Sequence, residues 1–360
     1  MKKFFILIAF CAQAIAGLAQ TKYPGDKGWQ PGPPAFGAEI EKDVRIPMED
    51  GVVLDAKVAY PTSLATGKRA EETFPVLVEF TPYEGEGAAE RLPYTYLTQR
   101  GYIVALVHPR GSGKSTGVLQ QFSSRDGLDG KAVVDWASKL DSSNGKVGFY
   151  GASYPGALAL ATAAKVGKSS PLKVIMAGAI GLGAQYRQAW TNNGLPTVLM
   201  MGYAPRAEAS MGGNEGAEKH FADFDKAFWA GGDPAYDGTF WQDRIPLRWS
   251  RDIVENGIPV LQWGGWQDLN ETGAVRGYVA FQNAVSPSTS LCSEVKRCRH
   301  AINSSSATGD TAWEWASAFT SNGSIRGSKA KIQALPTPPH PCIYTKRAVN
   351  AGLILSPIPR

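Results

Sequence analysis

The sequence has few cysteines and few histidines. Only four of its 360 residues are cysteine and only four are histidine. Cys11 lies in the opening segment and the other three lie near the end (Cys292, Cys298 and Cys342), an odd number that makes no disulfide framework. No Cys or His spacing indicates a structural metal site. We therefore expect no metal and no cofactor, and a fold stabilised by its core.

Long apolar runs are lacking after the first twenty residues, so we expect no membrane span in the mature chain. The opening is different. A basic start, Met1 to Lys3, precedes an apolar stretch from Phe4 to Ala16 and small residues from Gly17 to Ala19. This order is typical of a secretory signal peptide, and it predicts export to the periplasm or the extracellular space.

The net charge is only +5, and it is concentrated near the end. From Ser286 onward there are nine Lys and Arg against three Asp and Glu, which leaves 28 against 29 in the residues before it. The residues before Ser286 are thus nearly neutral overall, and nothing in them indicates an extended basic surface for nucleic acid.

Strands and helices alternate along most of the chain. The predicted strands are Glu39–Met48, Val52–Tyr60, Phe74–Phe80, Tyr102–His108, Leu172–Ile180 and Ile258–Trp263, the first two joined as a hairpin. The predicted helices are Pro93–Arg100, Asp129–Leu140 and a helix that ends near Val166. This alternation predicts an α/β fold with a mainly parallel sheet covered on both faces.

The stretch from Lys146 to Gly156 reads as strand, sharp turn and helix, with Ser153 at the apex. Glycines flank the serine, as the tight turn of a nucleophile elbow requires. A serine there sits at a helix N-terminus, where developing negative charge is favoured. The alternative is an ordinary turn with Ser153 as the N-cap, because the motif is G-x-S-x-P-G rather than G-x-S-x-G.

Two further motifs follow glycine-rich turns. Asp268 comes just after a predicted strand and downstream of Ser153, where a triad acid belongs; the alternative is an Asx turn. The stretch Gly111–Thr116 resembles a phosphate-binding loop, but the pattern requires glycine at position 108, which is His108. We therefore reject nucleotide binding.

Residues 184–250 are rich in aromatic side chains and interrupted by glycine. We interpret this region as a helical cap inserted into the α/β core and assign its aromatic residues to the core of the cap, with no substrate role. They are Tyr186, Trp190, Phe221, Phe224, Phe228, Trp229, Tyr236, Phe240, Trp241 and Trp249.

Together, four motifs resemble the family of cocaine esterase, X-Pro dipeptidyl peptidase and α-amino-acid ester hydrolase. They are Thr81-Pro-Tyr83, Arg110-Gly-x-Gly-x-Ser115-x-Gly117, Gly151-x-Ser153-Tyr154-x-Gly156 and Gly265-Trp266-x-Asp268, with Asn144–Gly148 before the elbow. The resemblance implies an α/β-hydrolase fold and a serine hydrolase acting on a small-molecule or short-peptide acyl substrate. Ester and amide bonds, including X-Pro peptide bonds, remain open.

The resemblance also implies roles for matching residues. Ser153 is then the nucleophile that forms an acyl-enzyme, and Asp268 orients a histidine base. The hydroxyl of Tyr83 and the backbone N–H of Tyr154 are then the oxyanion donors. The alternative for Tyr83 is a tyrosine at the rim of the site.

The catalytic histidine is unknown. His108 replaces an aspartate that relatives often carry, and we interpret it as a strand-end residue; His220 has no motif around it, and His300 lies in an unmatched setting. The tail from Ser286 lacks the family's histidine motif and its C-terminal jelly roll. This tail is either disordered or the product of a shifted reading frame. The alternative is therefore a catalytically silent α/β-hydrolase-like protein or a truncated product that lacks the triad histidine.

These observations divide the chain into five predicted regions. They are a signal peptide (1–20), the first part of the hydrolase core (21–183), the cap (184–250), the second part of the core (251–285) and the aberrant tail (286–360).

Overall fold

A computed structural model of the protein describes residues 32–83, 94–180, 186, 191–192, 195–196, 213–265 and 270–285. The predicted signal peptide and tail lie outside these residues. In the described part of the chain, no helix combines the length and apolar character needed to cross a membrane.

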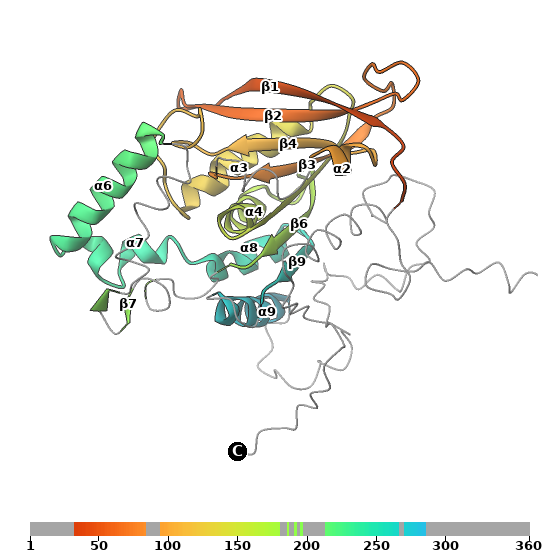
Figure 1. The fold of residues 1–360 in the computed structure, drawn as a ribbon. Helices are drawn as coiled ribbons and strands as arrows, with labels where there is room; N and C mark the ends of the chain where they lie inside the picture. The colour runs from red at the N-terminus through yellow and green to blue at the C-terminus, as the bar shows by residue number, and fades with distance from the viewer. Residues whose placement is uncertain are drawn as a thin grey trace, which may run out of the picture.

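The described residues form a seven-stranded sheet in the order β1-β2-β4-β3-β5-β6-β9 (Figure 1). The strands are β1 (Gly37–Pro47), β2 (Val53–Thr62), β3 (Phe74–Phe80), β4 (Ile103–His108), β5 (Ser143–Ala152), β6 (Leu172–Gly178) and β9 (Val260–Trp263). β1 and β2 pair antiparallel, β2 pairs antiparallel with β4, and the pairs from β4 to β9 are parallel. The predicted mainly parallel sheet with an antiparallel hairpin at its edge is confirmed.

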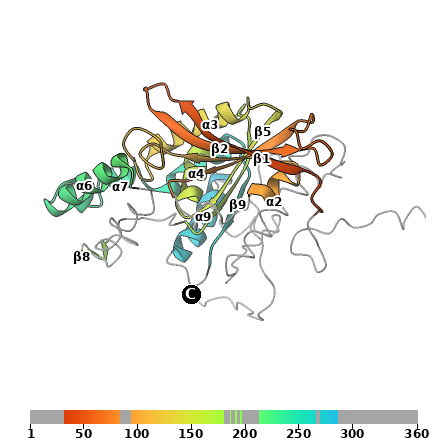
Figure 2. The same ribbon diagram turned by 45° about the horizontal axis from the view of Figure 1, so that its top comes forward.

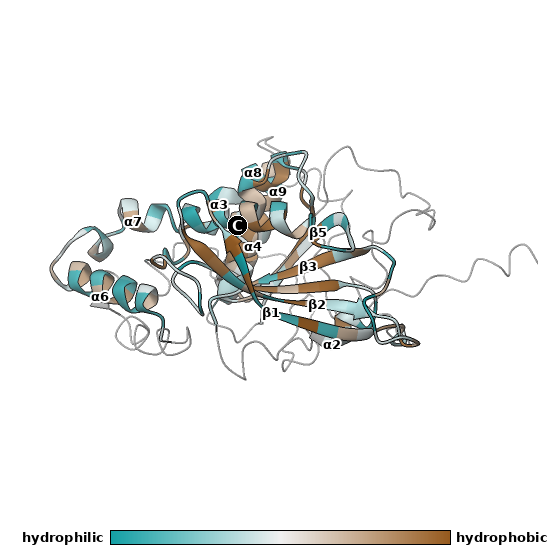
Figure 3. Ribbon diagram, turned by 90° about the horizontal axis from the view of Figure 1, so that it is seen from above, coloured by the Kyte–Doolittle hydropathy of each residue, from teal (hydrophilic) through white to brown (hydrophobic). Residues whose placement is uncertain are grey.

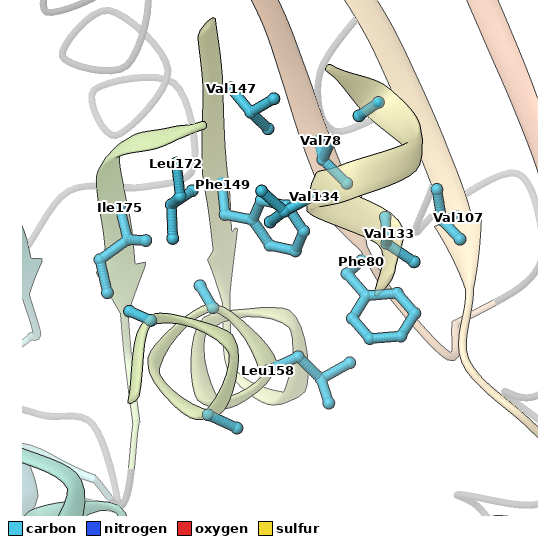
Figure 4. Close-up of a cluster of buried hydrophobic side chains, with 14 of the residues drawn as sticks. Val78, Phe80, Val107, Val133, Val134, Val147, Phe149, Leu158, Leu172 and Ile175 are labelled. Carbon is cyan, nitrogen blue, oxygen red and sulfur yellow. The ribbon is translucent and has the colours of Figure 1, made fainter. Parts of the chain in front are cut away.

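Helices cover both faces of this sheet (Figures 1 and 2). They are α2 (Tyr94–Thr98), α3 (Ser124–Ala137), α4 (Tyr154–Lys165), α8 (Ser250–Glu255) and α9 (Glu271–Val285). Successive residues of β3 point to opposite faces. Val76 and Val78 join the larger core cluster with α3 and α4, whereas Leu77 joins a smaller cluster with Leu97 of α2. Figure 4 shows the larger cluster, and Figure 3 shows the apolar strands at the centre of the molecule.

Helix α3 begins five residues earlier than predicted. Ser123 caps it by accepting a hydrogen bond from the N–H of Arg125. The buried side of its first turns consists of aspartate and glycine, so apolar spacing could not reveal it. A Cβ at Gly127 would lie 2.5 Å from the carbonyl oxygen of Ala161 in α4, which shows how closely the two helices approach.

The region predicted as a cap contains helices, of which α6 (Glu215–Trp229) and α7 (Thr239–Gln242) lie to one side of the sheet (Figures 1 and 3). It also contains η3 (Asp233–Ala235) and η4 (Pro246–Trp249), and a two-residue pair β7 (Thr191–Asn192) and β8 (Leu195–Pro196) precedes these helices. Four of its aromatic side chains form a separate buried cluster: Tyr186, Phe224, Phe228 and Trp241. Phe221 and Trp249 instead join the larger core.

The N-terminus of α6 is attached to the turn that follows β4. Asn214, the N-cap of α6, donates hydrogen bonds to the carbonyl oxygens of Gly113 (2.8 Å) and Ser115 (3.0 Å). A Cβ at Gly216 would lie 2.1 Å from the carbonyl oxygen of Gly117, so only glycine fits at this contact. The stretch that resembles a phosphate loop therefore holds the inserted region against the sheet.

Candidate active site

Ser153 occupies the turn between β5 and α4. Its φ of 63° and ψ of −128° lie in a region that costs a residue other than glycine about 1–3 kcal/mol. The hydroxyl makes no capping hydrogen bond to α4, and the residue is exposed. This geometry is that of a strained elbow that presents the hydroxyl to solvent, and it differs from an ordinary serine N-cap.

The glycines around Ser153 are required by close packing. A Cβ at Gly151 would lie 2.3 Å from Cβ of Pro155, and a Cβ at Gly156 would lie 3.0 Å from the carbonyl oxygen of Gly151. Pro155 itself is tolerated because it falls in the first turn of α4, where N–H groups have no acceptor within the helix. The G-x-S-x-P-G variant is therefore compatible with an elbow.

The elbow is held by the carboxyl ends of the neighbouring strands. The N–H of Ser153 donates to the carbonyl oxygen of Gly178 in β6 at 2.8 Å. Ala179, the residue after Gly178, donates its N–H to the carbonyl oxygen of Trp263 in β9 (2.9 Å). The carbonyl oxygen of Ala179 accepts a hydrogen bond from the side-chain amide of Asn270 (3.0 Å). Ends of three parallel strands thus meet beside the serine, where ligands bind in open α/β sheets.

The predicted acid is not among the groups that the structure places. Asp268 lies outside the described residues, between Gly265 and Asn270, and His300 lies outside them too. Within the described ranges, neither His108 nor His220 forms a hydrogen bond with Oγ of Ser153. The roles of Asp268 and of a histidine base stay predictions.

Tyr83 reaches Ser153 from the segment after β3. Its phenolic oxygen lies 3.2 Å from Oγ of Ser153, within hydrogen-bonding distance, although 70 residues separate them in sequence. β3 and β5 are neighbouring parallel strands, so the segments that follow them emerge at the same edge of the sheet. The structure therefore brings together two of the residues that the resemblance singled out.

The segment that carries Tyr83 is anchored to the end of β4. Thr81 donates its N–H to the carbonyl oxygen of Val107 at 2.9 Å, and its own carbonyl oxygen lies 3.0 Å from Nδ1 of the buried His108. The hydroxyl of Thr81 accepts the N–H of Tyr83 at 3.2 Å. His108 is therefore more than the strand-end residue expected from the sequence, because it holds the segment of Tyr83; the motif Thr81-Pro-Tyr83 is the sequence signal for that segment.

Tyr154 follows the serine, and its ring is completely buried. It packs against Phe122 in a tilted arrangement with ring centroids 4.3 Å apart, and it forms an edge-to-face pair with Tyr83 at a centroid distance of 6.4 Å. Its phenolic oxygen accepts the N–H of Phe122 at 3.3 Å. As the first residue of α4, Tyr154 has a backbone N–H at the positive end of the helix dipole.

Arg110 fixes the turn after β4 against α3. Its guanidinium forms a two-pronged, buried pair with Asp129, with N···O distances of 2.5 and 2.8 Å, and a third contact to Asp50 at 3.1 Å. Such forked pairs combine charge with fixed geometry. The arginine of this motif therefore has two structural partners, Asp129 and Asp50.

Comparison with known proteins identifies a family whose model covers the part of the chain that contains these residues. Residues 50–294 match the family model described as X-Pro dipeptidyl-peptidase (S15 family). This range contains the elbow, the segment of Tyr83 and Asp268. A search of curated proteins found no match.

Two solved structures share the fold. An aminopeptidase from a marine sediment archaeon (Thaumarchaeota) is 19% identical with a TM-score of 0.54, and the match covers 72% of this chain and 48% of that one. A selenomethionine-labelled α-amino acid ester hydrolase is 20% identical with a TM-score of 0.55, and the match covers 73% of this chain and 48% of that one. The chain thus spans about half the length of these proteins, and the fold is that of an α/β hydrolase.

Proposed function

The chain belongs to the X-Pro dipeptidyl-peptidase (S15) family, and from this membership we propose that it is a serine hydrolase that cleaves ester or amide bonds through an acyl-enzyme on Ser153. One observation carries the proposal. A strained, exposed serine at the end of β5 has a phenol 3.2 Å from its hydroxyl. We further propose export of the protein, on the basis of its basic and apolar opening.

In the proposed reaction, Oγ of Ser153 attacks the carbonyl carbon of the substrate and loses its proton to a histidine base held by Asp268. The resulting oxyanion accepts hydrogen bonds from the hydroxyl of Tyr83 and the N–H of Tyr154. Collapse of the adduct breaks the bond to the leaving group, which takes up the proton. Water then attacks the acyl group on Ser153 and releases the acid.

Tyr83 is suited to this role because its hydroxyl is already beside the nucleophile. In the free protein it shares a hydrogen bond with Ser153, and in the adduct it would turn to the oxyanion, which is a stronger acceptor. Its segment is held by Thr81 and β4, so the donor is positioned before substrate binds. Such preorganisation is the main source of electrostatic stabilisation in acyl transfer.

Labelling with a fluorophosphonate tests the proposal directly. We expect the probe to modify folded protein at Ser153, as identified by peptide mass mapping, and the variant S153A to remain unlabelled. Hydrolysis of p-nitrophenyl acetate and of an X-Pro p-nitroanilide by the same samples would distinguish ester from amide cleavage. A folded protein that shows neither labelling nor turnover would instead be a catalytically silent member of the family.

A further inference from the structure

Asp126 is a completely buried carboxyl group beneath the elbow. It lies in the first turn of α3, and its side chain has no ion-pair partner among the described residues. Oδ2 lies 3.5 Å from the phenolic oxygen of Tyr154, whereas Oδ1 is buried with no hydrogen-bond partner in the described part of the chain. Burial of an unpaired carboxylate is costly, so this environment favours the neutral acid.

The charged groups that face Asp126 come from three elements. Asp129 lies one turn further along α3, Arg110 follows β4, and Arg244 follows α7. Arg110 is already paired with Asp129, and Arg244 donates to the carbonyl oxygens of Gln121 and Phe240. Burial and the charge of Asp129 raise the pKa of Asp126 to about 7, against the opposing effects of the two arginines and of a hydrogen bond from the backbone of Ser123.

Tyr154 connects this carboxyl group to the reacting atoms. Its hydroxyl faces Asp126, its ring meets the edge of Tyr83, and its backbone N–H is the proposed oxyanion donor next to Ser153. A change at Asp126 therefore acts on both proposed donors through one side chain.

We propose that Asp126 is a positioning residue that acts through Tyr154: as the neutral acid it holds the oxyanion donors in place, and when it ionises its negative charge opposes the oxyanion that forms at Ser153. This inference rests on the proposed hydrolase function. Asp126 is completely buried, and a charge within the protein interior is screened less by water than a charge at the surface. Reaction at Ser153 should therefore slow when Asp126 loses its proton.

The link between Asp126 and Tyr154 can be measured without any turnover. Protein labelled with ¹³C at the ζ carbon of tyrosine would be titrated from about pH 5 to pH 9, and the Tyr154 resonance would be assigned with the variant Y154F. We expect this resonance to shift with a midpoint near pH 7 in the wild type and to stay constant in D126N. A Tyr154 resonance that does not respond to pH in the wild type would overturn the proposal, even if D126N failed to fold.

The effect on Ser153 is measured as the rate of phosphonylation by a fluorophosphonate in D126N relative to the wild type. The ratio cancels the titration of the base, which both proteins share. We expect a ratio near one at about pH 5.5 that rises about three- to tenfold by about pH 8.5. The matched control is D135N, which removes an exposed carboxylate of α3 that pairs with Lys131, and its ratio should stay near one.

The outcomes separate this inference from the function on which it rests. A ratio that is independent of pH, whether near one or uniformly low, means that Asp126 has a structural role only and overturns the positioning role while the hydrolase function stands. A wild type that does not react at any pH overturns the hydrolase function and the positioning role together.

Discussion

Pro155 occupies the space that the Cβ of any residue other than glycine at position 151 would need. The distance from such a Cβ to Cβ of Pro155 would be 2.3 Å, and the distance to the backbone carbon of Pro155 would be 2.9 Å. The two residues flank Ser153, so this contact sets how tightly the elbow can close. Because position 151 is glycine, Pro155 fits two residues after the serine without a steric clash.

The variant G151A should therefore open the elbow. We expect a loss of about 1–3 kcal/mol in the free energy of unfolding, measured by urea denaturation, and loss of fluorophosphonate labelling at Ser153. The double variant G151A/P155G should recover part of the stability, because it removes one of the two colliding carbons. The control is G32A, since a Cβ at Gly32 meets nothing within 4 Å; equal losses in G151A and G32A would contradict the close contact.

The central strands β3 and β4 could be predicted from sequence because they are nearly continuous apolar runs. β3 and β4 are buried along their whole lengths, and they begin and end within one residue of the predicted bounds. The start of α3 could not be predicted in this way. Its buried positions include Asp126 and Asp129, and a helix face made of such residues has no apolar period.

Without the family resemblance, the contact between Tyr83 and Ser153 could be predicted only through topology. Tyr83 and Ser153 are 70 residues apart, and nothing in their local sequence indicates contact. They meet because β3 is hydrogen-bonded to β5, a pairing that depends on the strand order of the whole sheet. The contact of Asp126 with Tyr154 depends in addition on the packing of α3 against α4, which no motif encodes.

Removing the hydroxyl of Tyr83 should reduce turnover with little effect on the fold. We expect Y83F to lower kcat on an activated ester about 100-fold, because one oxyanion donor is worth about 3 kcal/mol of barrier. KM should change little, since the hydrogen bond strengthens only in the transition state. The control is Y236F, which removes the hydroxyl of an exposed tyrosine in the inserted region. A Y83F protein with wild-type kcat would show that Tyr83 is a residue of the rim.

His108 should act on catalysis only through the segment that carries Tyr83. Its Nδ1 lies 3.0 Å from the carbonyl oxygen of Thr81, so H108A loses this anchor and we expect kcat to fall about tenfold. The variant H108N keeps an N–H donor near the same position and should recover part of the rate.

A double-mutant cycle tests this dependence on Tyr83. If His108 acts by positioning the phenol, H108A/Y83F should be no slower than Y83F alone. Independent, multiplying losses would show that His108 contributes to turnover by another route. Circular dichroism of each variant would establish that the fold is intact.

Ionisation of Asp126 should make the protein less stable as the pH rises. Its pKa is about 7 in the folded protein and about 3.9 in an unfolded chain, so the folded state binds more protons between these values. The contribution of Asp126 to the free energy of unfolding should therefore be largest below about pH 4, fall up to about pH 7 and remain low above it. The upper limit of this loss is on the order of 4 kcal/mol. Urea denaturation of D126N at several pH values should show that this contribution is gone.

His220 should oppose this trend. Its Nε2 is buried without a hydrogen-bond partner among the described residues, and burial together with the charge of Arg244 lowers its pKa to about 4. The unfolded chain, with a histidine pKa near 6.5, then binds more protons, so this contribution to stability increases between about pH 4 and pH 6.5. The wild type should change little in this window because the two contributions offset each other. D126N should gain stability as the pH rises, H220Q should lose it, and parallel curves for the two variants would contradict the assignment.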